Sequence, residues 1–382
     1  MRSNNTKSRY LYIDNLRLAM IVLVVMLHLA VTYSGIGSWY LKDTVELDIV
    51  SFVFFGLFQS FTQAYFMGFL FLISGYFVAN SYDKKGCKQF LKDRFIRLGI
   101  PTIFYMLVIH PFNAYVLLGN FSDHKPTFIE YYTEFLVSLK FLSASGPLWF
   151  AFALLIFNCI YALFRYLTKH SVIEKEKELT NLKTAILIIL LIAICAFLIR
   201  IVQPIDSSIL NMQLCFFSQY IILFIIGIKA GRYDWFSKLT YKDGRKWFFA
   251  ACIPGILLWV IMLLVGGVLT SGFDIFKGGI HWQSAAYALW ESFTAVAMSI
   301  GLISIFKEKY NKQGKWVKRM SDSSFTVYMF HSPIIIIVSL VLLNIKIAPI
   351  PKFIVACLIG CPLSFLISHN IIRRIPLLKK IL

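Results

Sequence analysis

The chain has 382 residues, of which 58% are hydrophobic and only 15% are charged, and its mean hydropathy is +0.72. A soluble domain carries roughly 25% charged residues, so the composition excludes an ordinary soluble enzyme and indicates a membrane protein. The formal net charge is +19, from 38 lysines and arginines against 19 aspartates and glutamates. Such a charge is compatible with nucleic-acid binding or with membrane topology, and its distribution along the chain decides between them.

Apolar runs close to 20 residues long recur along the whole chain, and each is long enough to cross a bilayer as a helix. We predict about ten such spans and an all-α, polytopic fold that forms one integral membrane domain over residues 1–382. The predicted spans cover residues 12–34, 51–80, 98–119, 147–167, 184–202, 212–230, 247–269, 281–305, 322–343 and 351–373. The seven cysteines have no spacing typical of a metal site or a disulfide framework.

The lysines and arginines are distributed very unequally between the two ends of these spans. Thirty lie in segments on one side, seven, including Arg200 and Lys352, on the other, and Arg17 is inside a span. Because basic loops stay in the cytoplasm, this asymmetry predicts that both termini are cytoplasmic and that the chain is a multi-pass protein of the inner (cytoplasmic) membrane. No basic patch is interleaved with aromatic residues on a soluble domain, so the predicted partner is the lipid bilayer and not a nucleic acid.

The first span contains three ionisable residues, Asp14, Arg17 and His28. On a helix, the eleven residues from Arg17 to His28 rise about 16.5 Å and return to within about 20° of the same face. With the N-terminus inside, Arg17 lies near the cytoplasmic end and His28 lies toward the far side. Asp14 is one turn from Arg17 and can pair with it. Ionisable residues inside a membrane are costly, which makes these three candidates for a functional site.

Three further points along the chain carry polar residues of possible function. Arg94 and Arg97 are three residues apart, on one helical face just before the third span, and arginine pairs of this kind suit phosphate. Glu291 lies near the middle of the eighth span, where a lone carboxylate needs a partner or a proton. His331 lies about ten residues into the ninth span. Both Glu291 and His331 could meet His28 inside the bundle.

Four motifs in chain order resemble those of the acyltransferase 3 family of integral membrane O-acyltransferases. They are IDNLRLAMIVLVVMLH (13–28), FMGFLFLISGYF (66–77), FLKDRFIRLGIP (90–101) and SSFTVYMFHSPI (323–334). The last is similar to a Tyr-x-x-His-x-Pro element and contains Tyr328. GPLWFAFALLIF (146–157) resembles the branch related to the glucan succinyltransferases of bacterial osmoregulated glucans. Trp149, at the predicted outer end of its span, is a candidate stacking surface for a sugar.

The resemblance implies that acyl-CoA is the donor substrate, that no cofactor is bound, and that a hydroxyl of an extracytoplasmic glycan is the acceptor. It also implies that His28 is essential, and a histidine can act as a general base near neutral pH. Arg17, Arg94 and Arg97 would hold the donor phosphates, and Glu291 could orient or charge-balance His28, as a carboxylate does in hydrolytic triads. The acyl group, acetyl or succinyl, and the oligomeric state stay open. The alternative is a transporter or exporter of a glycan or a lipid-linked precursor, which also keeps charges inside the membrane.

Overall fold

The computed structural model describes residues 10–43, 46–121, 126–168 and 182–379. Within these ranges the chain is helical and has no β-strand, and nine helices are long and apolar enough to cross a membrane. The predicted all-α, polytopic fold is therefore confirmed. The cytoplasmic position of the termini stays a prediction, and the tail 1–9 and much of the basic segment 165–183 lie outside the described residues.

The elements of the first half are α1 (Leu11–Ser34), α2 (Ile49–Arg94), η1 (Phe95–Gly99), α3 (Ile100–Phe104), η2 (Tyr105–Ile109), α4 (His110–Phe121), α5 (Phe128–Val137), η3 (Lys140–Ser143), η4 (Gly146–Leu148) and α6 (Trp149–Thr168). Those of the second half are α7 (Leu182–Val202), η5 (Leu214–Phe216), α8 (Phe217–Tyr233), α9 (Trp235–Lys238), α10 (Tyr241–Ala250), η6 (Ala251–Gly255), α11 (Ile256–Val265), α12 (Val268–Ser271), α13 (Asp274–Lys277), α14 (Trp282–Lys309), α15 (Lys315–Leu343), α16 (Pro349–Asn370), η7 (Ile372–Arg374) and α17 (Pro376–Lys379).

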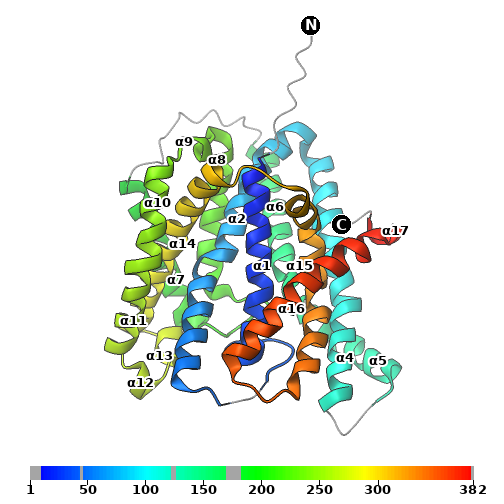
Figure 1. Cartoon of the computed structure of the whole chain (residues 1–382). Helices are drawn as coiled ribbons and strands as arrows, with labels where there is room; N and C mark the ends of the chain where they lie inside the picture. The colour runs from blue at the N-terminus through cyan, green and yellow to red at the C-terminus, as the bar shows by residue number, and fades with distance from the viewer. Residues whose placement is uncertain (1–9, 44–45, 122–125, 169–181, 380–382) are drawn as a thin grey trace.

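Two of the ten predicted spans, 51–80 and 98–119, lie in one continuous helical stretch from Ile49 to Phe121. Gly86 interrupts this stretch with φ 71° and ψ 169°, a conformation that costs glycine little because it has no Cβ. Figure 1 shows the chain rising through α2 to the upper end of the molecule and descending again to α4. The stretch therefore contains two passes, which accounts for nine helices where ten spans are predicted.

Prolines shape the descending pass. Pro101 and Pro111 each follow a π-helical segment, η1 and η2 respectively. A proline has no N–H and its ring crowds the carbonyl four residues earlier, so the regular hydrogen-bond ladder cannot continue through it. For Pro111 that carbonyl belongs to Leu107, and it accepts a hydrogen bond of 3.0 Å from the Tyr132 hydroxyl of α5. The break in the ladder thus becomes the attachment point for α5.

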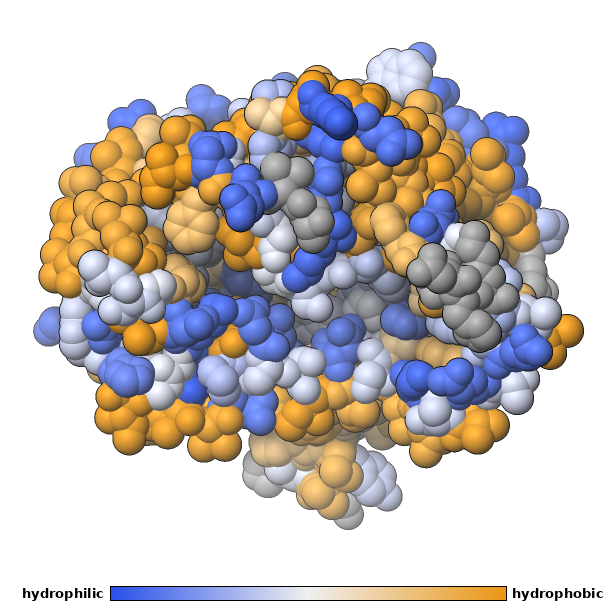
Figure 2. Space-filling view, turned by 90° about the horizontal axis from the view of Figure 1, so that it is seen from below, coloured by the Kyte–Doolittle hydropathy of each residue, from blue (hydrophilic) through white to orange (hydrophobic). Residues whose placement is uncertain are grey.

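Large apolar side chains cover the sides of the bundle. Leu187, Leu258 and Leu358, on three different helices, are all more than half exposed. Seen from the lower end of the molecule, hydrophobic side chains make up much of the periphery, and hydrophilic side chains border a hollow near the middle (Figure 2). Apolar sides with polar groups gathered inside are what a bilayer requires, because lipid cannot hydrogen bond to the protein.

Helices α2 and α8 pack backbone to backbone through glycines. A Cβ added to Gly231 would lie 2.0 Å from the carbonyl oxygen of Tyr76, and one added to Gly227 would lie 2.2 Å from that of Leu72. Gly75 faces Gly227 across the same interface. Without a hydrophobic driving force between helices in lipid, close approach through small residues is a main source of association. This contact sets the position of both helices at the upper end of the bundle.

We therefore expect Gly231→Val to separate α2 from α8 and to destabilise the protein by about 1–3 kcal/mol or more, as overpacking does. The measurement is the midpoint of thermal unfolding in detergent. Gly119→Val is the matched control, because its Cβ would meet open space in helix α4. Equal midpoints for the two variants would contradict the close packing.

Candidate active site

Helix α1 carries Arg17 and His28 on one helix without interruption from Leu11 to Ser34. The two side chains therefore lie at two depths, separated by about 16.5 Å of helix rise. Asp14 pairs with Arg17, with 3.7 Å between Oδ1 and Nη1, as predicted. α1 packs against α2, α14, α15 and α16 and lies in the middle of the bundle (Figure 1). It is the element that connects the two parts of the site.

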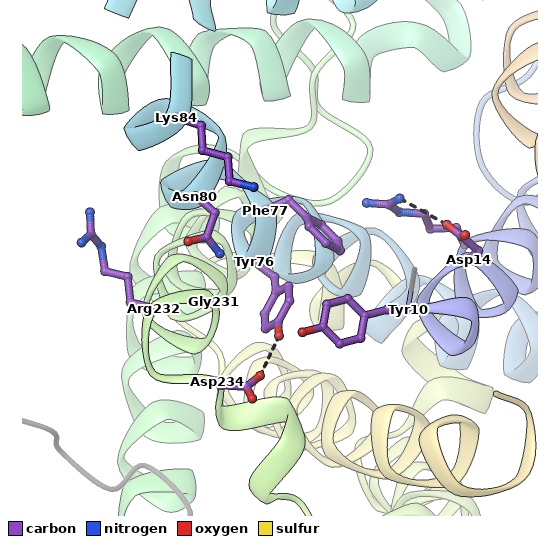
Figure 3. Close-up of a pocket in the computed structure, with 10 residues that line it drawn as sticks. Tyr10, Asp14, Tyr76, Phe77, Asn80, Lys84, Gly231, Arg232 and Asp234 are labelled. Carbon is purple, nitrogen blue, oxygen red and sulfur yellow. Dashed lines mark hydrogen bonds and ion pairs between the residues drawn. The ribbon is translucent and has the colours of Figure 1, made fainter. Parts of the chain in front are cut away.

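A cavity of about 610 Å³ lies at the Arg17 end of α1, between α1, α2 and α8 (Figure 3). Its lining consists of Tyr10, Asp14, Arg17, Tyr76, Phe77, Asn80, Lys84, Gly231, Arg232 and Asp234. In Figure 3 the Lys84 side chain extends from α2 toward Phe77, while Tyr10 and Tyr76 lie beside Asp234. Three cations, two carboxylates and three aromatic rings thus surround one space. In the sequence analysis, Lys84 and Arg232 belong to the thirty basic residues on one side of the membrane, and no binding role is predicted for them.

Contacts across the cavity hold its walls in place. The Tyr76 hydroxyl donates a hydrogen bond of 2.9 Å to Asp234, which ends α8 in a left-handed conformation with φ 50°. The Arg17 guanidinium lies 5.0 Å from the centroid of the Phe77 ring. Cationic and aromatic side chains around a single space suit a ligand that carries both negative charge and a flat ring.

Arg94 and Arg97 lie near the same end, where α2 passes into η1. The Arg94 guanidinium is half-buried over the Phe90 ring at 5.0 Å, and the charges of Arg97 and Arg17 both act on it. The three arginines singled out by the sequence are therefore grouped, although Arg94 and Arg97 do not line the cavity itself. Grouped like charges repel one another, and a bound polyanion would relieve that repulsion.

At the deeper level, His28 meets two aromatic side chains. Its ring centroid is 3.7 Å from that of Trp39 and 5.2 Å from that of His331, and all three ring planes are within 16° of parallel. The third distance, Trp39 to His331, is 6.1 Å. These distances place Trp39 over one face of His28 and His331 to its side. The sequence analysis suggested that His331 could meet His28, and this geometry agrees with it. The sequence analysis did not single out Trp39.

The register between α1 and α15 follows from a set of hydrogen bonds at the upper end. The Asn15 amide donates to the carbonyls of Tyr310 and Lys312 at 2.6 and 3.1 Å, and Gln313 donates to Asn15 Oδ1 at 2.9 Å. Since residues 310–314 lead directly into α15, this contact starts α1 and α15 side by side and in the same direction. His28 and His331 then reach the same depth.

The ring of His331 is held in one orientation. Its Nδ1 is 3.1 Å from the Val327 carbonyl oxygen and 3.0 Å from that of Tyr328. A carbonyl can only accept, so Nδ1 carries the hydrogen and Nε2 of the neutral ring has the lone pair. That Nε2 is buried, and no described residue hydrogen bonds to it. His28, in contrast, is only partly buried.

A polar network borders the histidines toward the lower end. The Tyr40 hydroxyl is 2.7 Å from His110 Nδ1 and 3.0 Å from the Tyr105 hydroxyl. Tyr105 is 2.7 Å from Ser332 Oγ, to which the Asn113 amide donates at 3.1 Å. The network joins the connection after α1 to the helix that carries His331. The sequence analysis did not identify this network, because Tyr40 lies in a loop and its partners lie on two other membrane passes. Helical periodicity relates only residues of the same helix.

Comparison with known proteins decides which class of membrane protein carries this site. The chain matches the family described as "Acyltransferase domain" (Acyl_transf_3) over residues 10–369. The chain belongs to the acyltransferase 3 family. It is 24% identical to proteins named "Glucans biosynthesis protein C" from Salmonella schwarzengrund (strain CVM19633), Salmonella typhi and Salmonella typhimurium (strain LT2), over 97% of this chain and 94% of each relative. No solved structure gives a significant match. The chain is thus a membrane O-acyltransferase, and the transporter alternative loses its support.

In the structure of this acyltransferase, Glu291 has an ion-pair partner that the sequence analysis did not assign, and its role toward His28 stays a prediction. Its carboxylate pairs with the guanidinium of Arg200, and both side chains are buried. Arg200 also lies over the rings of Phe216 and Tyr287, at 5.3 and 5.7 Å. The sequence analysis placed Arg200 among the seven basic residues of the outer side, whereas it lies in the last turn of α7 and is buried inside the bundle. A lone carboxylate in the middle of the membrane needs a partner, as the sequence analysis expected. That partner is Arg200 of α7.

Tyr328 and Trp149 occupy neighbouring positions in the core. The Tyr328 hydroxyl donates to the carbonyl of Pro147, which ties α15 to the turn before α6. Trp149 is half-buried and lies 5.7 Å from Tyr220 and 6.5 Å from Phe217, centroid to centroid.

Within the described ranges no three His, Cys, Asp or Glu side chains are grouped to hold a metal ion.

The buried pair gives a test of what Glu291 does. Arg200→Met or Glu291→Met alone leaves one charge unpaired in the interior, and we expect each to cost about 3–5 kcal/mol of unfolding free energy. The double variant Arg200→Met/Glu291→Met should recover most of this loss and keep acyl transfer. The surface pair of Lys277 and Asp206, 2.8 Å apart, is the control, and Asp206→Asn should cost at most about 1 kcal/mol. A stable double variant that has lost transfer would contradict a purely structural role and support the predicted catalytic role of Glu291.

Proposed function

We propose that this acyltransferase moves an acyl group from cytoplasmic acyl-CoA to a hydroxyl of an extracytoplasmic glycan, in the inner membrane. The observation that carries the proposal is that one helix, α1, has a cationic cavity at one end and a histidine pair about 16.5 Å further along. Acyl-CoA has phosphates and a flat base at one end and its thioester at the end of a long arm. The two levels of α1 match these two ends.

The donor is proposed to bind with its nucleotide end at the cavity. Arg17, Lys84 and Arg232 supply positive charge from three sides of the lining, and Arg94 and Arg97 extend it beside the cavity. The rings of Tyr10 and Tyr76 offer surfaces for the base. Arginine binds phosphate oxygens in a forked geometry, so this composition favours a phosphorylated donor over a neutral one.

His28 is proposed to be the general base. The acceptor hydroxyl oxygen attacks the thioester carbonyl carbon while its proton passes to His28, and the carbon–sulfur bond then breaks. The CoA thiolate leaves and takes the proton from His28, so the products are an ester of the acceptor and the CoA thiol. His331, with the Nε2 lone pair turned away from its own backbone bonds, is placed beside His28 to stabilise the imidazolium that forms. Asp14 keeps Arg17 in place through their ion pair.

The acceptor class is supported by the relatives, whose name assigns them to glucan biosynthesis. The hydrophilic hollow at the lower end of the bundle, opposite the cationic cavity, is a suitable entrance for a sugar chain (Figure 2). Acetyl and succinyl are both kept as the acyl group, and a direct assay with each CoA thioester distinguishes them.

Replacing both Arg94 and Arg97 with glutamine should weaken binding of acetyl-CoA or succinyl-CoA about tenfold or more, since each charge-assisted bond is worth about 1.5–3 kcal/mol. Binding of the matching acyl-pantetheine, which has no phosphates, should change little. Isothermal titration of the purified protein measures both. Lys315→Gln/Lys318→Gln removes the same charge from exposed positions at the start of α15 and is the control. Equal losses for the two ligands would make Arg94 and Arg97 topology charges only.

His28→Ala should abolish acyl transfer while the protein stays inserted and folded, because the base is lost and His331 is too buried to replace it. The assay uses oriented proteoliposomes with the acyl-CoA on the basic side and a short linear glucan on the other, and mass spectrometry of the glucan reads the product. His281→Ala, an exposed histidine at the start of α14, is the control. Near-normal transfer by His28→Ala would refute the general-base role, and efficient transfer with both substrates on the basic side would refute the sidedness.

A further inference from the structure

The connection that follows α1 does not lead directly to α2. Gly35 and Gly37 have φ of 69° and 96°, conformations that favour glycine, and they turn the chain back against α1. A Cβ on Gly37 would lie 3.5 Å from the Val31 side chain, so the returning chain touches the last turns of the helix. This segment, residues 35–43, carries Trp39 back to the level of His28.

Apolar contacts hold part of the segment, with Leu41 buried, and polar contacts attach it along its length. At its start, the Gln59 amide donates to Ser34 Oγ at 2.7 Å. At its end, the Asp43 N–H donates to the Thr32 carbonyl at 2.8 Å, and Lys352 Nζ is 2.6 Å from Asp43 Oδ2. Between them, Tyr40 bonds to His110 and Tyr105, as described above. These are discrete contacts that a movement of the segment can break and make again.

Trp39 occupies the lower, acceptor-side approach to the proposed base. Its ring stacks on His28 at 3.7 Å, and Trp39 as a whole is partly exposed. No other molecule can contact the covered face of His28 while the indole stays there. An acceptor sugar that approaches from this side must displace Trp39.

We infer that Trp39 is a gate that selects a glycan hydroxyl over water as the acyl acceptor, an inference that rests on the proposed function. While the gate is closed, the indole covers one face of His28 and separates that face from the outer aqueous phase. A bulky acceptor opens it by filling the space that the indole leaves.

The reaction that the gate suppresses is hydrolysis of the donor. In it, water attacks the thioester carbonyl carbon and His28 takes the proton. The carbon–sulfur bond breaks, the CoA thiolate takes that proton, and the products are a free carboxylic acid and the CoA thiol. Water is smaller than a sugar and far more abundant, so His28 alone cannot exclude it, and exclusion of water from a closed site is a general means of preventing such side reactions.

The first measurement tests the gate without any acyl transfer. Diethyl pyrocarbonate modifies unprotonated imidazole, and peptide mass spectrometry gives the rate at His28, with exposed His281 as internal reference. Trp39→Ala should raise the rate at His28 relative to His281 by about two- to tenfold, the factor expected for the loss of one aromatic contact. Trp39→Phe keeps a ring and should lie near the unchanged protein. Trp282→Ala removes an exposed indole at the start of α14 and should have no effect.

The second measurement is CoA release from acetyl-CoA and succinyl-CoA without acceptor, separated by chromatography. Trp39→Ala should raise this release by a similar factor, and the rise should vanish in Trp39→Ala/His28→Ala. An unchanged modification rate at His28 would overturn the gate, whatever the activity. The gate would also be overturned if Trp39→Ala raised the modification rate at His28 without raising CoA release, provided that the unaltered protein transfers acyl groups to a glucan. If the unaltered form shows no transfer from either donor, the proposed function has failed instead.

Discussion

A polar group inside the hydrocarbon must find its partner within the protein, and this one constraint organises the bundle. Arg200 and Glu291 pair with each other and thereby join α7 to α14. Asn113 bonds to Ser332, and the carbonyl freed by Pro111 bonds to Tyr132. The first two contacts join passes that apolar packing alone would leave free to slide, because lipid is as apolar as the helices themselves, and the third attaches α5.

The same constraint explains the place of the proposed catalytic residues. α1 carries its charges at one end, where they face a cavity, and its histidine deep in the bundle, where another histidine faces it. The hydrogen bonds of Asn15 to the segment before α15 set the depth at which His28 and His331 meet. The proposed separation of donor binding from chemistry rests on one helix, α1, which is held in register at its upper end.

The two ends of the site differ in how they are built. The cavity at the upper end lies between helices that pack through glycine, and its walls are held by the contact of Tyr76 with Asp234. The approach to His28 from below is covered by residues 35–43, a connection held by a few hydrogen bonds and one ion pair. This difference suits the proposed gate, which would open for a large acceptor and exclude water at other times.

Much of the architecture could be predicted from the sequence. Apolar length determined the spans, because a helix must be long enough to cross the bilayer, and helical geometry alone put Asp14, Arg17 and His28 on α1 at known separations. Family motifs then pointed to the chemistry. The inferences about the spans and about the residues of α1 succeeded because they depend on neighbours within one helix, whose geometry is regular.

Only the tertiary structure decided which residues meet across helices. Glu291 pairs with Arg200, which lies 91 residues away in the chain. Lys84 and Arg232 join Arg17 around one cavity because glycines bring α2 and α8 together, and Trp39 covers His28 because a loop turns back on itself. Sequence periodicity does not encode such contacts, since they depend on how separate helices rotate and slide against one another during packing.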